Sequence, residues 1–222
     1  MVLRRESGLV ETVRVEVYKD YENGTLGLGV RVVDDEATVA DLLEVWEPLS
    51  DDPGVSKRYD SGRGSCRGCV NNCCNSAFVI PDLIAFKALC RETGVSAEES
   101  LERWFDPESR DAGILRWRYG PCIFLKERLC SIYRQRSLIC RFYLCTNMLG
   151  ETEQMIYSVV TAGISALYVR LEERGLLNPV DRSLTGFDLA LRDLISEYRD
   201  HPGTTEFLKA DGYHEVMLKA FP

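Results

Sequence analysis

Cysteine is the residue type whose number and spacing point to chemistry in this sequence. The 222-residue chain has nine cysteines and two histidines. The first group runs from Cys66 to Cys74 and places Cys69 three residues after Cys66 and Cys73 four residues after Cys69. Gly68 allows the first two sulfurs to turn toward one ion, and a four-residue step keeps the next sulfur on the same face of a helical turn. This group therefore predicts three local metal ligands.

Two cysteines of the first group, Cys73 and Cys74, are adjacent. Because neighbouring side chains point in divergent directions, we expect only one of them to bind the same metal atom as the rest of the group. The other would serve a second atom of a cluster or a separate site. The spacing leaves open which of the two has which role.

A second group of cysteines follows about fifty residues later. Zinc sites and iron-sulfur clusters both require four protein ligands as a rule, so the two groups must converge in space to complete a site. The sequence predicts the following metal ligands, with Cys73 and Cys74 as alternatives for one position: Cys66, Cys69, Cys73, Cys74, Cys122, Cys130, Cys140 and Cys145.

Three further residues have the right chemistry but the wrong surroundings for a ligand. Cys90 shares a predicted helical face with Leu83 and Phe86, so we interpret it as a small buried hydrophobic side chain. His201 and His214 lie in the C-terminal part, where we expect ordinary surface or capping roles. The mixed Cys/His zinc patterns are therefore excluded near the cysteines.

The cysteine blocks resemble the YkgJ-like cysteine-cluster proteins, a family described as a zinc- or iron-chelating domain with a CxxCxxCC signature. Four blocks occur in the family's order, ending near Cys145: residues 66–74, Pro121 to Leu125, Cys130 to Tyr133, and Arg136 to Arg141. This chain has one extra residue before the paired cysteines, and Ile123 and Ser137 replace family prolines. The resemblance implies a bound metal centre, either zinc or iron-sulfur, but no particular reaction.

The number of thiols favours an iron-sulfur cluster, used for redox chemistry or in an enzyme site, because one zinc ion needs fewer cysteines. The alternative is a zinc-stabilised binding module without catalytic activity. Thiol-disulfide exchange is the weaker third reading, since it needs only two cysteines. No nucleophile and base pattern is visible, so catalytic residues, and whether the protein is an enzyme, stay open.

Charge is unevenly distributed along the chain. The net charge is -8, yet residues 116–141 hold seven arginines and lysines against Glu127 alone. These cations either offset the charge of thiolate ligands or pair with surface carboxylates. The acidic total argues against a general nucleic-acid binder, so the expected partner is an unidentified protein or small molecule.

The predicted location is the cytoplasm. Met1 to Val10 carries charged residues and lacks the apolar core of a secretory signal, and an odd number of clustered cysteines fits reduced thiols. The uncharged stretch Met155 to Val169 is too short to span a membrane, which requires roughly 20 apolar residues. A buried helix explains it better.

The expected fold is mainly helical, of the α+β kind, with a small N-terminal β-hairpin and a helical domain organised by metal. Alternating residues predict the hairpin on either side of residues 21–24, and helices are expected after Thr38, from Pro81 to Gly94, from Ser96, over 156–171, after Thr185, and near 216–221. We divide the chain into an N-terminal region (1–60), a cysteine-cluster domain (61–146) and a C-terminal helical region (147–222).

Overall fold

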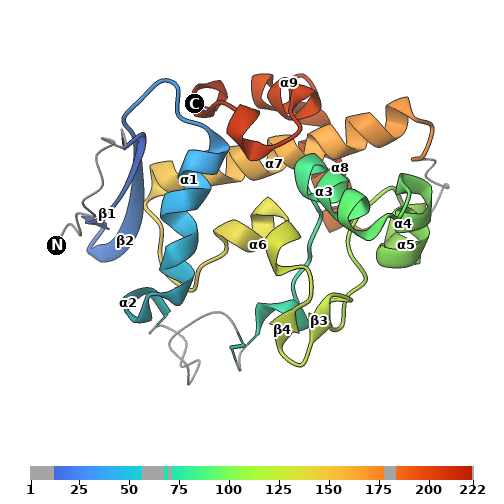
Figure 1. The fold of residues 1–222 in the computed structure, drawn as a ribbon, viewed down its shortest axis with the longest axis horizontal. Coiled ribbons are helices and arrows are strands. Elements are labelled where there is room, and N and C mark those ends of the chain that lie inside the picture. Colours follow the sequence, from blue (N-terminus) through green and yellow to red (C-terminus); the bar gives the residue numbers. More distant parts are fainter. Residues whose placement is uncertain (1–12, 57–67, 70–71, 178–183, 222) are drawn as a thin grey trace.

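The fold is mainly helical with a small N-terminal hairpin, which confirms the predicted α+β class (Figure 1). A computed structural model describes residues 13–56, 68–69, 72–177 and 184–221. The helices are α1 (Val39–Trp46), α2 (Pro53–Ser56), α3 (Leu83–Thr93), α4 (Ala97–Trp104), α5 (Pro107–Asp111), α6 (Leu138–Phe142), α7 (Gly150–Glu173), α8 (Gly186–Glu197) and α9 (Pro202–Lys209).

The N-terminal hairpin consists of β1 (Val15–Glu22) and β2 (Thr25–Val32), paired in antiparallel register. Asn23 and Gly24 form the two-residue turn with φ values of 51° and 79°, a left-handed conformation that these two residue types tolerate well. Leu28 makes two backbone hydrogen bonds, of 3.0 and 2.9 Å, with the segment just before α7. The predicted hairpin is confirmed, and its second strand is tied to the helical body.

Local sequence signals explain where several helices begin. Thr38 and Asp41 form a complete capping box at the start of α1, and Ser96 caps α4 through the amide of Glu99. The helix expected from Pro81 begins two residues later, because the carboxylate of Asp82 accepts a hydrogen bond from the amide of Ala85 and so caps α3. Asp82, rather than Pro81, is the start signal there.

The long helix α7 is the central element, and α3, α6, α8 and α9 pack against it (Figure 1). Its residues from Val159 to Leu167 are buried, including two polar side chains, Thr161 and Ser165, and Gly163. A Cβ at Gly163 would lie 2.8 Å from the Cβ of Asp82 and 3.2 Å from the ring of Phe207. Glycine is therefore required for α3 and α9 to approach α7. Among the described helices, none is long and apolar enough to cross a bilayer.

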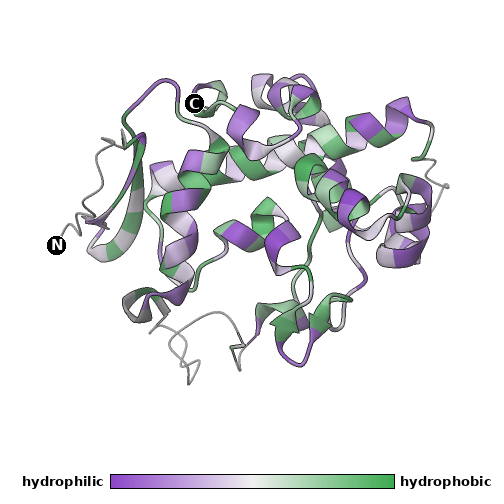
Figure 2. Cartoon of the chain, viewed as in Figure 1, coloured by the Kyte–Doolittle hydropathy of each residue, from purple (hydrophilic) through white to green (hydrophobic). Residues whose placement is uncertain are grey.

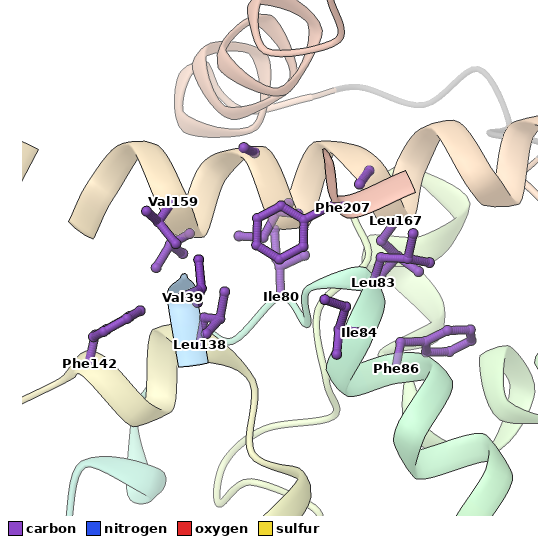
Figure 3. Packing of buried hydrophobic residues seen from close by; sticks show 14 of the residues in the cluster. Val39, Ile80, Leu83, Ile84, Phe86, Leu138, Phe142, Val159, Leu167 and Phe207 are labelled. Atoms are coloured by element: carbon purple, nitrogen blue, oxygen red, sulfur yellow. The ribbon is translucent and has the colours of Figure 1, made fainter. Parts of the chain in front are cut away.

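Hydrophobic core residues pack around the middle of α7. Figure 3 shows Val159 and Leu167 of α7 and Phe207 of α9 facing Val39, Ile80, Leu83 and Leu138. Phe207 is fully buried. Residues from all three regions of the predicted domain division contribute to this one core, and the division itself stays a prediction.

The C-terminal segment differs from expectation. The helix expected near 216–221 is two single 3-10 turns, Tyr213–Glu215 and Leu218–Ala220. Between them the chain is extended and pairs with the residues before α1, through hydrogen bonds from Val39 to the carbonyl of Val216 and from Leu218 to the carbonyl of Ala37. Those contacts hold the segment in an extended conformation.

Candidate metal centre

The first cysteine segment is held in place by Asn72. Its side-chain oxygen accepts a hydrogen bond of 2.8 Å from the amide of Cys74, and its side-chain nitrogen donates one of 3.2 Å to the carbonyl of Arg128. Cys73–Asn75 then forms a 3-10 turn. Gly68, with φ of 76°, occupies the left-handed region that glycine favours. Cys66 lies outside the described residues.

The second cysteine segment begins at Cys122, whose amide donates a 2.8 Å hydrogen bond to the carbonyl of Cys74. It continues into a short antiparallel hairpin, β3 (Leu125–Lys126) and β4 (Leu129–Cys130). Its turn residues Glu127 and Arg128 both have positive φ, 48° and 65°. The guanidinium of Arg128 donates a 2.5 Å hydrogen bond to the carbonyl of Gly68. The hairpin turn and the first cysteine segment are thus fastened to each other. Figure 2 colours this hairpin hydrophobic except at its turn.

Helix α6, which carries Cys140, is positioned by Asp82. One carboxylate oxygen accepts a 2.9 Å hydrogen bond from the amide of Leu138 in the first turn of α6. The other accepts from Ala85 in α3 and from the hydroxyl of Tyr213, at 3.0 and 2.9 Å. Asp82 is fully buried, so this carboxylate links α3, α6 and the C-terminal segment in a site closed to water.

These elements enclose a cavity of about 500 Å³, which we call the cysteine cavity. Every described cysteine of the two predicted groups lines it, namely Cys69, Cys73, Cys74, Cys122, Cys130, Cys140 and Cys145. The two groups therefore converge, as the sequence predicts. Among the described residues no three Cys, His, Asp or Glu side chains form a ready-made site for a single ion, so the thiols are spread around the cavity wall.

Cys73 and Cys74 do not diverge as expected for adjacent residues. Their thiols share a hydrogen bond, and both line the cysteine cavity. The hydrogen bond from Cys74 and the nearby backbone amides lower the pKa of Cys73 to about 7, against the opposing effect of burial. The same hydrogen bond, together with burial, raises the pKa of Cys74.

Backbone amides point at other sulfurs in the cavity. The sulfur of Cys122 accepts hydrogen bonds from the amides of Phe124 and Leu125, and that of Cys130 accepts one from Ile132. Such bonds favour the thiolate form, although burial outweighs them and raises the pKa of both thiols. Burial, and then the nearby cysteines, raise the pKa of Cys140 to about 12. A bound cation would remove the penalty that keeps these thiols protonated.

The arginines of the basic segment lie both at the cysteine cavity and outside it. Arg136 and Arg141 reach one carboxylate, that of Glu47, at 3.4 and 2.7 Å, and both line the cysteine cavity. Burial raises the pKa of Glu47, but the two guanidiniums outweigh burial and leave it lowered. Arg116, by contrast, pairs with Asp106 at 3.4 Å outside the cavity. All three therefore pair with carboxylates, and the role of Arg136 and Arg141 in offsetting thiolate charge stays a prediction.

The cysteine and the two histidines that are not predicted as metal ligands lie away from the cavity wall. Cys90 is on α3, packs against the hydrophobic core and does not line the cavity. His201 caps α9 by accepting a 3.0 Å hydrogen bond from the amide of Gly203, and His214 is an exposed surface residue. The expected surface and capping roles of the histidines are confirmed.

A comparison with family models decides what this arrangement is related to. Residues 65–159 match the family CxxCxxCC, described as "Putative zinc- or iron-chelating domain". This region of the chain is therefore similar to the CxxCxxCC family. The YkgJ-like resemblance is consistent with that family. Neither the curated proteins nor the solved structures contain a match to this chain.

The match extends past the last predicted ligand. The matched region spans α3, α6 and the beginning of α7, and so includes Asp82, the residue that joins α3 to α6. Cysteine thiolates are soft ligands that suit zinc and iron-sulfur clusters, so the donors around the cavity fit either group. The family description and the thiols around the cavity both support metal binding, without distinguishing zinc from iron.

Proposed function

We propose that the cysteine cavity holds an iron-sulfur cluster, used in electron transfer or as part of an enzyme site. The observation that carries the proposal is the convergence of seven described cysteines around one cavity of about 500 Å³. A single zinc ion is satisfied by four ligands, whereas a group of several iron and sulfide atoms uses thiols spread over a larger wall.

Among the thiols, Cys69, Cys122, Cys130 and Cys140 would hold the cluster, with Cys66 as a further ligand from the first group. Each of them matches both the spacing and the family blocks. When bound, such a cluster supplies one-electron redox chemistry. Cys73 or Cys74 is the remaining candidate of the first group, and Cys145 that of the second.

The surrounding residues would tune and protect this centre. Backbone amides donate to the sulfurs of Cys122 and Cys130, and hydrogen bonds to sulfur are one determinant of a cluster's reduction potential. Arg136 lines the same cavity and offsets thiolate charge. The buried rings of Trp117 and Phe124 form an apolar wall that keeps water away. A reduced-thiol centre also agrees with the cytoplasmic location, which stays a prediction.

A second candidate is a zinc-stabilised binding module. The feature that favours it is the small size of the elements around the cavity: β3 and β4 have two residues each and α6 has five. Elements of this length do not form stably by themselves. A metal that joins them to the first cysteine segment would contribute directly to folding.

The deciding experiment measures iron, zinc and acid-labile sulfide in protein purified without oxygen. The cluster proposal predicts brown protein with matching amounts of iron and sulfide. Stoichiometric zinc in colourless protein without sulfide would select the zinc module instead. The matched variants are Cys122→Ser, in the cavity, and Cys90→Ser, outside it; both cysteines are half-buried. Cys122→Ser should lose metal, and Cys90→Ser should retain it.

A further inference from the structure

The cysteine cavity is larger than a metal centre requires. Its volume of about 500 Å³ falls within the range of roughly 300–1,000 Å³ that is typical of pockets for small organic ligands. Such pockets combine a mainly apolar lining with a few polar groups that orient the ligand. The cavity therefore has room for an organic molecule beside the metal.

The cavity wall is divided by chemistry. The cysteines occupy one part, while the aromatic rings of Phe78, Trp117 and Phe124 line another. Trp117 and Phe124 pack edge to face, with ring centroids 5.3 Å apart. Rings fixed in this way offer a preformed surface to a flat, apolar ligand body.

The charged groups on the wall have one sign. Arg128, Arg136 and Arg141 line the cavity, and none of the described lining residues is Asp, Glu, Lys or His. Glu47 is shared between Arg136 and Arg141, and Arg128 forms no ion pair with a described residue. Two guanidiniums thus compete for one carboxylate, which leaves cationic donors for a second anion.

Arg136 is the best placed of the three to receive that anion. Its guanidinium lies 3.7 Å from the ring centroid of Tyr133, and its longer contact to Glu47, 3.4 Å, leaves that carboxylate mainly to Arg141. Its side chain is only 14% exposed, so stacking and partial burial hold the planar fork in one orientation. Its Nε donates a 3.0 Å hydrogen bond to the carbonyl of Tyr133, so a carboxylate would be bound by two parallel hydrogen bonds from the two terminal nitrogens.

We infer that the cysteine cavity binds a small organic carboxylate with a flat apolar body, which sits beside the metal centre with its carboxylate on Arg136. The inference rests on the proposed metal centre and names the class of ligand that this centre would act on or be regulated by. The arginine supplies specificity for the anion, and the aromatic wall supplies affinity for the body.

The test is a calorimetric titration of the metal-loaded full chain with benzoate and with benzamide, its neutral counterpart. Charge-assisted hydrogen bonds predict benzoate binding at least about tenfold tighter than benzamide binding. Equal affinities, or no binding of either, would overturn the inference. Iron and sulfide content is measured first, so absence of metal refutes the proposed function, whereas metal without benzoate binding refutes only this inference.

Arg116 provides a matched control for Arg136. Its side chain is 19% exposed, contacts one carboxylate at 3.4 Å and stacks 3.8 Å from the ring centroid of Tyr119, but it does not line the cavity. Arg136→Gln should weaken benzoate binding about tenfold and leave benzamide unchanged, while Arg116→Gln should change neither by more than about twofold. Benzoate binding that survives Arg136→Gln would place the carboxylate elsewhere and overturn the assignment.

Lysine substitutions at the same two positions keep the inference testable if the glutamine variant loses its metal. Arg136→Lys keeps the positive charge but not the planar fork, so metal should remain and benzoate affinity should fall between that of the unchanged protein and Arg136→Gln. Arg116→Lys is its control. Full benzoate affinity in Arg136→Lys would contradict two-point binding of the carboxylate.

Discussion

The helical body around α7 and the cysteine cavity are stabilised in opposite ways. In the body, long helices bury apolar side chains, and Phe207 and Leu167 are completely inaccessible to solvent. Around the cavity, elements of two to five residues are held by a few polar contacts, such as those of Asn72, Arg128 and Asp82, although α6 also places Leu138 in the core. Apolar packing spreads stabilisation over many weak contacts, whereas each short element at the cavity depends on a small number of hydrogen bonds.

This difference teaches that stability and metal binding can be perturbed separately. A substitution in the helical body should lower the free energy of unfolding without changing metal binding by the folded protein. A substitution that removes one of the polar contacts around the cavity should mainly reduce metal retention. Asp82 belongs to both regions, because it caps α3 and holds the start of α6.

The largest expected effect on stability is that of Phe207→Ala. Removing this fully buried ring from between α7 and the C-terminal segment should lower the free energy of unfolding by about 3–5 kcal/mol. The metal content of the folded protein should stay unchanged. Urea denaturation and metal analysis check both parts, with Leu189→Ala, a residue 50% exposed, as the control within about 0.5 kcal/mol. A parallel loss of metal would contradict the separation of the two regions.

Asp82→Asn should affect both regions. An asparagine has one acceptor oxygen, so it cannot accept from Leu138 on one side and from Ala85 and Tyr213 on the other. We expect a loss of about 1–3 kcal/mol in unfolding free energy and reduced metal retention through displacement of Cys140.

The control for Asp82 is Asp106→Asn, which alters a comparable helix cap. Asp106 accepts a 2.9 Å hydrogen bond from Ser109 at the start of α5, outside the cavity. Denaturation and metal analysis should show a smaller loss of stability and an unchanged metal content. Unchanged metal retention in Asp82→Asn would show that Asp82 does not position α6 for metal binding.

Features carried by local sequence were predictable. Thr38 and Asp41 predict the start of α1, and the apolar spacing over 156–171 predicts α7. Both signals depend only on residues a few positions apart. The convergence of the cysteine groups followed from the number of ligands that a thiolate site needs. The start of α9 also has a local signal, because His201 caps the helix and Pro202 follows it. From the sequence we expect a surface or capping role for His201 but no helix after it.

The polar contacts that hold the short elements around the cavity could not be predicted from the sequence. Arg128 and Gly68 are 60 residues apart, and Asp82 and Leu138 are 56 apart. Neither pair has a spacing rule, since their contact depends on how the whole chain packs. The hydrogen bond between the thiols of Cys73 and Cys74 was not predictable either, because a 3-10 turn separates adjacent side chains by about 120° and does not by itself bring them together.

A smaller effect on stability, with a clear effect on metal, is expected at the β3 to β4 turn. Arg128→Gly removes a positive-φ strain of about 1 kcal/mol but also the hydrogen bond to Gly68, so unfolding free energy should change by less than about 1 kcal/mol. Release of metal to a chelator should become faster. Glu127→Gly is the matched variant, because it relieves strain at φ of 48° and leaves the guanidinium in place. Equal release rates for the two variants would mean that Arg128 does not fasten the cavity.

The smallest effect is a change of slope in the pH dependence of zinc binding to the metal-free protein. Each ligand that is still a protonated thiol releases one proton on binding, so affinity should rise about tenfold per pH unit for each such ligand. The raised pKa values of Cys122, Cys130 and Cys140 keep these thiols protonated across neutral pH. Cys73, with a pKa of about 7, is already a thiolate above that pH and stops contributing.

The slope should therefore decrease by about one near pH 7 if Cys73 is a ligand, and Cys73→Ser should abolish that change. Competition with a chelator of known zinc affinity between about pH 6 and 8.5 measures the slope. A constant slope in the unchanged protein would assign the ligand role to Cys74, whose raised pKa keeps it protonated throughout this range. The measurement thus decides between the two adjacent cysteines, which neither the spacing of the motif nor the shape of the cavity distinguishes.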